Sequence, residues 1–151
     1  MKRFHLVALL AAAVPLLSAC AIGTGWRQLQ PVAGLDPEAA LPVSVIHTRI
    51  ADSHREPFAE HTRRVMATLP QQPGLVAYAL RRELIGDNAW VIAVWASEAD
   101  RQRFVGGAAH QTAIATAGPG LSSLRIVRAN LKPAELPLQW ERARALLEAQ
   151  P

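Results

Sequence analysis

The sequence has little of what small disulfide-bonded or metal-stabilised proteins depend on. Only one of its 151 residues is a cysteine, Cys20, which excludes an intrachain disulfide and a zinc site built from several cysteines. Glycine-rich phosphate and dinucleotide motifs, the HExxH pair of zinc proteases and the GxSxG turn of serine hydrolases are all missing. Nucleotide-dependent and hydrolytic activities therefore lack positive support, and we expect neither a metal nor a bound cofactor.

An excess of charge of one sign is also absent. The chain has 16 basic and 12 acidic residues, but Lys2 and Arg3 belong to a segment that we expect to be removed, which lowers the net charge from +4 to +2. No basic stripe remains, so nucleic acid is not an expected partner. Half of the residues are hydrophobic, which is enough for the packed core of one domain.

The longest apolar run, residues 6–17, is too short to cross a bilayer core of ~30 Å, which needs about 20 helical residues. It has the length of the apolar region of a signal peptide, and Lys2 and Arg3 supply the positive charge before it. The run ends in Leu-Ser-Ala-Cys at positions 17–20, which resembles the lipobox of bacterial lipoproteins. The resemblance implies that residues 1–19 are removed and that Cys20 carries a diacylglycerol. The alternative is an ordinary signal peptide cut at the same place, with Cys20 unmodified.

Two or more acyl chains hold a protein on a bilayer stably, because each buried methylene contributes about 0.8 kcal/mol. We therefore expect a protein that is attached to membrane lipid through Cys20 without crossing the membrane. Ala21, rather than an aspartate, follows the cysteine, as in lipoproteins sorted to the outer membrane, which predicts a place in the cell envelope facing the periplasm. Residues 20–40 mix Gly, Pro and small side chains without periodicity and are interpreted as the lipidated cysteine and a flexible tether.

From residue 41 onward the hydrophobic pattern predicts an α+β domain. β-branched or alternating segments predict strands at 42–50, 75–85, 89–95 and 121–131. With one helix after the first strand and one after the third, the order is βαββαβ, the ferredoxin-like arrangement with a four-stranded antiparallel sheet. This domain spans residues 41–131, and an amphipathic C-terminal helix follows within residues 132–151.

The helix boundaries are predicted from capping residues. Ser53 and Glu56 are spaced as a capping box for the first helix, although Pro57 offers a competing start at a first helical position. The second helix is expected to begin after Ser97, whose hydroxyl is a good N-cap, and to end at residues 118–120, which read Gly-Pro-Gly.

Both faces of the predicted hairpin are apolar. Val76, Tyr78 and Leu80 point to one side of the sheet, and Ala77 and Ala79 point to the other. Two helices cover only one face, and a large apolar patch is rarely left in water by a monomer. An identical sheet from a second chain would bury the other face and predicts a homodimer. The C-terminal helix is the alternative cover.

Two segments resemble the domains of antibiotic biosynthesis monooxygenases. Residues 72–78 (QPGLVAY) look like the start of the second strand in that family. Residues 94–99 (VWASEA), with Phe104 and His110 after them, look like its transition into the second helix. The resemblance covers residues 41–131 and implies a dimeric α+β barrel. It also implies a cofactor-independent monooxygenase for a small aromatic or quinol-type substrate, although the family includes haem-degrading oxygenases and proteins without demonstrated chemistry.

The candidate site residues follow from their chemistry and from this resemblance. His110 and His47 are candidate general bases, and the phenol of Tyr78 is a third candidate catalytic group. The candidate substrate-binding residues are Trp95, Trp90, Arg82 and Phe104. Each has a structural alternative, such as a hydrogen-bonded histidine or an aromatic side chain that fills the core. For the whole chain, the alternative to an oxygenase is a non-catalytic envelope module for ligand binding or dimerisation, and haem ligation by His110 is a weaker third hypothesis.

Overall fold

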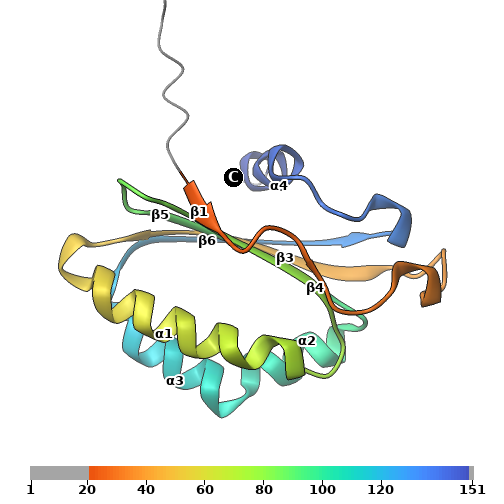
Figure 1. Cartoon of the computed structure of the whole chain (residues 1–151), viewed down its shortest axis with the longest axis horizontal. Helices are drawn as coiled ribbons and strands as arrows, with labels where there is room; N and C mark the ends of the chain where they lie inside the picture. The colour runs from red at the N-terminus through yellow and green to blue at the C-terminus, as the bar shows by residue number, and fades with distance from the viewer. Residues whose placement is uncertain (1–20, 150–151) are drawn as a thin grey trace, which may run out of the picture.

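The computed structural model describes residues 21–149 and contains one antiparallel sheet (Figure 1). Its strands are β1 (Ala21–Gly23), β2 (Arg27–Gln28), β3 (Leu41–Ile50), β4 (Leu75–Glu83), β5 (Asn88–Trp95) and β6 (Leu121–Leu131). They lie in the order β1-β4-β5-β3-β6, and β2 also pairs with β4. The predicted ferredoxin-like α+β fold is therefore confirmed. The proposed signal peptide and Cys20 lie outside the described residues.

Helices cover both faces of this sheet (Figure 1). Three of them lie on one face: α1 (Arg55–Thr68), α2 (Glu98–Gly106) and α3 (Ala108–Ala117). The C-terminal helix α4 (Trp140–Glu148) lies on the other. The remaining helical segments are short 3-10 turns at 32–34, 52–54, 69–71, 118–120 and 133–135.

The face below α4 holds the larger part of the hydrophobic core. Val45 on β3 pairs with Ile92 on β5 and with Val127 on β6, so these three side chains point to the same side. Ala143 and Leu147 of α4 pack on this layer and are buried with it. The N-terminal segment adds side chains to the same core, namely Trp26, Leu35 and Ala39. The second apolar face is thus covered within one chain by the C-terminal helix, which the sequence analysis gave as the alternative to a second chain.

The opposite face is filled mainly by aromatic and long aliphatic side chains. Trp95 at the end of β5 is only 1% exposed and packs with Tyr78 of β4. Leu69, directly after α1, and Phe104 of α2 close this second cluster from the helical side. The sheet is therefore packed on both faces, by the core under α4 on one side and by this second cluster on the other.

Two expectations about helix boundaries need correction. The capping box at the start of α1 is not formed, because the hydroxyl of Ser53 bonds to Nδ1 of His54 at 3.0 Å and the chain enters the helix through a 3-10 turn. The single second helix is instead split into α2 and α3 at Gly107, whose backbone is extended. Adjacent glycines favour this break, since glycine is a poor helix former. The cap at Ser97 is confirmed: its Oγ accepts a hydrogen bond from the Asp100 amide at 3.1 Å.

The segment interpreted as a tether is, from residue 21 onward, part of the folded domain. Ala21 pairs with Glu83 and Gly23 with Arg81, and Arg27 pairs with Tyr78 further along β4. The interpretation failed because β4 would otherwise be an edge strand with unsatisfied backbone groups, which accept a partner strand of almost any composition. Composition and periodicity, on which the interpretation rested, carry no information about that edge.

Candidate functional site

A pocket with a volume of about 520 Å³ lies between α1 and the sheet. Phe58 and Met66 of α1 form one wall, and Ile50, Leu80 and Val91 from three neighbouring strands form the other. Register explains the second wall: Leu80 pairs with Val91, so both side chains point to the helical side of the sheet. This volume and these walls suit a small apolar molecule with one or two rings.

The same pocket has a basic rim. Four arginines line it, Arg55, Arg63, Arg81 and Arg82, against two carboxylates, Glu83 and Asp87. Three of these charged groups already form ion pairs with residues outside the pocket. Within residues 21–149, Arg81 and Arg82 form no ion pair. Arg82 follows Leu80 by two residues in β4 and so shares its helical side, where it would offer a bound anion a guanidinium group that need not break an existing pair.

A polar network lies at the hairpin end of the sheet, and two of its members, Glu83 and Asn88, line the pocket. The Asn88 side-chain amide donates from Nδ2 to Glu83 Oε2 at 2.8 Å, and its Oδ1 lies 2.8 Å from His47 Nε2. Because an amide oxygen only accepts, Nε2 of His47 is the donor in this hydrogen bond. The His47 ring stacks on Trp90, with centroids 5.1 Å apart and planes 9° from parallel. Arg49 binds Asp87 beside this network at 2.7 Å.

Four of the predicted site residues meet in one aromatic cluster rather than in the pocket. Phe104 lies 5.1 Å from Trp95 and 4.8 Å from His110 between ring centroids, and Tyr78 is buried beside Trp95. His110 approaches the Val105 carbonyl with Nδ1 at 3.2 Å. Burial lowers the pKa of His110 below its ordinary value, and the hydrogen bond to Val105 opposes this only in part. The imidazole is therefore neutral at pH 7.

The structure thus divides the predicted residues into three groups. Arg82 and Trp90 are among the residues that line the pocket. A second group forms the aromatic cluster next to the pocket: Tyr78, Trp95, Phe104 and His110. Met66 and Leu80 contact this cluster and also line the pocket. His47 does not line the pocket, but it contacts two residues that do: Asn88 by a hydrogen bond and Trp90 by ring stacking.

Sequence reasoning missed the contribution of α1 to the pocket. Phe58 and Met66 belong to an apolar stripe at helical spacing, which indicates a buried face without telling whether core or cavity lies beneath it. Arg55 was missed as well. Its only signal is a positive charge at the start of a helix, where a negative charge is preferred.

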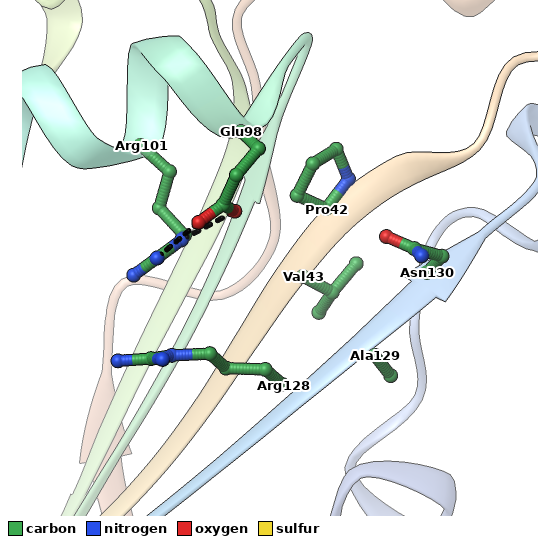
Figure 2. A pocket seen from close by; sticks show the side chains of 7 residues that line it. All are labelled: Pro42, Val43, Glu98, Arg101, Arg128, Ala129 and Asn130. Carbon is green, nitrogen blue, oxygen red and sulfur yellow. Dashed lines mark hydrogen bonds and ion pairs between the residues drawn. The ribbon is translucent and has the colours of Figure 1, made fainter.

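A second, smaller pocket of about 330 Å³ is polar (Figure 2). Arg101 is buried there and donates to both carboxylate oxygens of Glu98, from Nε at 2.7 Å and from Nη2. These bonds, followed by one from Gln102, lower the pKa of Glu98 to about 2. Figure 2 shows the guanidinium of Arg128 on the same side of the pocket as that of Arg101. Because Arg101 is already paired, this pocket is a weaker candidate than the apolar one.

Neither histidine site has the geometry of a metal or haem centre. Within residues 21–149, no three His, Cys, Asp or Glu residues lie close enough to hold a metal ion. Haem ligation would need the His110 imidazole to face a cavity, but its ring packs on Phe104 and it lines neither pocket. None of the helices within residues 21–149 is long and apolar enough to cross a membrane.

The comparisons with known proteins agree with this fold. Residues 43–116 match the family profile of antibiotic biosynthesis monooxygenases. A candidate antibiotic biosynthesis monooxygenase from Nitrosomonas europaea superposes with a TM-score of 0.57 at 14% identity, over 64% of this chain and 95% of that one. A second from Caulobacter crescentus gives 0.56 at 18% identity, over 62% and 91%.

A candidate monooxygenase from Lactobacillus acidophilus also gives a TM-score of 0.57, at 14% identity over 65% of this chain. This chain spans about half of that protein's length, 47%. No protein with a curated description is significantly similar to the sequence. At these identities the structures establish the fold, and the profile match adds the family of the segment. Residues 43–116 are therefore a domain of the antibiotic biosynthesis monooxygenase type.

Proposed function

We propose that this chain is an exported lipoprotein, anchored to the cell envelope through Cys20, whose domain binds a small aromatic or quinol-type anion and oxidises it with O₂. The observation that carries the proposal is the pocket between α1 and the sheet. It combines apolar walls, a volume of about 520 Å³ and a basic rim in which the side chains of Arg81 and Arg82 form no ion pair within the described chain. The solved structures with this fold include several candidate monooxygenases.

The pocket residues would act by binding and charge stabilisation. Phe58 and Met66 hold the ring and keep water out, and the guanidinium of Arg82 faces the phenolate oxygen. A nearby positive charge lowers the pKa of a phenol, so a substrate that ionises near neutral pH needs no strong protein base. Preorganised donors at the oxygen then stabilise the charge that is delocalised into the ring during the reaction with O₂.

The overall step balances without a further reductant. A phenol with a ring C–H loses two hydrogens and becomes a quinone: one oxygen atom of O₂ forms the new C=O bond, and the other leaves with both hydrogens as water. The substrate supplies the electrons and O₂ is reduced. Within this scheme the candidate bases His47 and His110 remain predictions, since neither lines the pocket.

Oxygen uptake and ligand binding test the proposal directly. Naphthols and quinols should quench the fluorescence of the protein and be consumed with O₂ in a one-to-one ratio. Arg82→Gln should weaken binding about 10- to 100-fold, because a hydrogen bond to a charged group contributes about 1.5–3 kcal/mol. Arg64→Gln is the matched control: Arg64 is exposed on α1 outside the pocket. If both variants bind equally well, the pocket is not the binding site.

A second candidate, a ligand-binding module without chemistry, is favoured by one observation. Among the described residues, the lining of the apolar pocket includes no histidine and no tyrosine. Binding that depends on Arg82 without any oxygen uptake across the panel would support this reading. Uptake that requires a stoichiometric ligand would support the oxygenase.

Membrane attachment and assembly are separate parts of the proposal. Replacement of Cys20 by Ala should prevent lipid modification, which mass spectrometry of the membrane-extracted protein measures. Proteins of this family are typically homodimers. Because α4 covers one sheet face, a second copy would have to contact other surfaces, such as the side of β6 that exposes Leu124 and Ile126. Sedimentation over a range of concentrations decides between monomer and dimer.

A further inference from the structure

One end of the sheet exposes large apolar side chains. The connection between β4 and β5 exposes 52% of Leu84 and 87% of Ile85. Ile22 on the adjacent strand β1 is 42% exposed. Single exposed hydrophobic residues are common and need no explanation, whereas three at one edge suggest contact with an apolar phase. We call these three residues the tip patch.

The path of the chain brings the expected anchor to the same edge. Ala21 pairs with Glu83, the last residue of β4, and Ile22 pairs with Arg82. Figure 1 shows β1 alongside this end of the hairpin. Cys20 directly precedes Ala21, so the pairing of β1 fixes the attachment point of a lipid within a residue or two of Leu84 and Ile85.

Positive charge accompanies the tip patch. Arg81 and Arg82, the partners of Gly23 and Ile22, form no ion pair within the described residues. Arg49 is also exposed at this end, although it is paired with Asp87. Apolar side chains flanked by arginines are the pattern of surfaces that insert into the interface of an anionic bilayer.

The apolar pocket extends to the same edge. Ile22, Gly23 and Thr24 of β1 line it together with Gly86 and Asp87 of the hairpin connection. A ligand that leaves a bilayer beside the tip patch would therefore reach the pocket walls without crossing the rest of the surface. Membrane contact and pocket access thus fall at one place in the fold.

We propose that the tip patch docks into an anionic bilayer and that the pocket takes its ligand, a membrane-soluble phenol or quinol, from that bilayer. The inference rests on the proposed lipid anchor and on the proposed ligand class. It adds an orientation: the β4–β5 hairpin end faces the membrane, and the opposite end of β4, near residue 71, faces away.

Because the chain has only one cysteine, a fluorophore can be attached at a single chosen position. In the mature, membrane-extracted chain a lipidated Cys20 has no free thiol, so Ile85→Cys introduces the only site for a thiol-reactive NBD fluorophore. Gln71→Cys, exposed at the other end of β4, is the matched control. Both labelled proteins are reconstituted into vesicles of phosphatidylethanolamine and phosphatidylglycerol, some containing a nitroxide-labelled lipid that quenches NBD.

The proposal expects blue-shifted emission at position 85, with quenching by the nitroxide lipid about twofold or more above that at position 71. Equal emission and quenching at the two positions would overturn the docking surface. Equal insertion into phosphatidylcholine vesicles would overturn the role given to the arginines. The parent chain, labelled in the same way, tests the anchor separately: NBD uptake by unmodified Cys20 would overturn the lipidation and not the tip patch.

Discussion

Leu147 offers a quantitative test of how the second face of the sheet is buried. Its side chain is 5% exposed and packs with Ala143 and Leu138 against the core layer of β3, β5 and β6. Its carbonyl also accepts a hydrogen bond from Arg125 Nη2 at 2.6 Å, which joins the end of α4 to β6. Leu147→Ala removes the buried side chain and leaves this backbone contact in place.

The expected loss of unfolding free energy is about 2–3 kcal/mol, the lower half of the range for buried leucine, because the site lies near a helix end where neighbours can relax. For a folded domain of this size each kcal/mol lowers Tm by about 3–5 °C, so the melting temperature should fall by about 6–15 °C. Leu84→Ala is the matched control. Leu84 is exposed at the hairpin, and its truncation should change stability by less than about 0.5 kcal/mol.

Thermal unfolding by circular dichroism at two protein concentrations is the appropriate assay. A large shift for Leu147→Ala that does not depend on concentration supports burial within one chain. If the two variants melt together, α4 does not hold the sheet. If the Leu147→Ala shift grows on dilution, a second chain contributes to covering this face.

Two further predictions concern individual residues. Because burial lowers the folded pKa of His110, the unfolded chain binds its proton first as pH falls; the stability should decrease from about pH 6.5 down to that lowered pKa. His110→Gln should reduce this slope in urea titrations at pH 7.5 and 5.5, whereas His61→Gln should retain it. Gly74 has a φ of +76°, and a Cβ there would lie 2.2 Å from Asp100 Cγ, so Gly74→Ala should destabilise by about 1–3 kcal/mol. Gly106→Ala meets open space in α2 and should be neutral or stabilising; equal melting temperatures for the two variants would contradict the strain at Gly74.

The parts of the fold that the sequence predicts are those set by local chemistry. The alternation of β3 and the hydroxyl of Ser97 each act within a few residues, and both appear in the structure as expected. The start of α1 was missed because Ser53 had two partners within reach, the helix amides and the His54 ring, and sequence does not rank them. The pairing of residues 21–28 with β4 was missed because it joins segments about fifty to sixty residues apart.

The candidate site could likewise be predicted only in part, because it depends on contacts between distant segments. Phe104 and His110 were placed on the correct helical region, but whether they face a cavity or a packed ring depends on the side chains opposite them, here Trp95. Strand parity predicts that His47 and Arg49 share a face, yet it does not tell which face the helices cover. The packing of α1 over Leu80 decides where the cavity forms, and this packing cannot be predicted from any single residue of the sequence.

The pairing of β1 with β4 also bears on how far the proposed lipid anchor would let this domain move from its membrane. An unstructured stretch of twenty residues would let the domain range over about 65 Å from its point of attachment. Because residue 21 is already paired in the sheet, a lipid on residue 20 would be joined to the folded domain by a linker of only a few ångströms. A domain anchored as proposed would act on its own bilayer: it would move over that surface in two dimensions, and partners on an opposing membrane would lie beyond its reach.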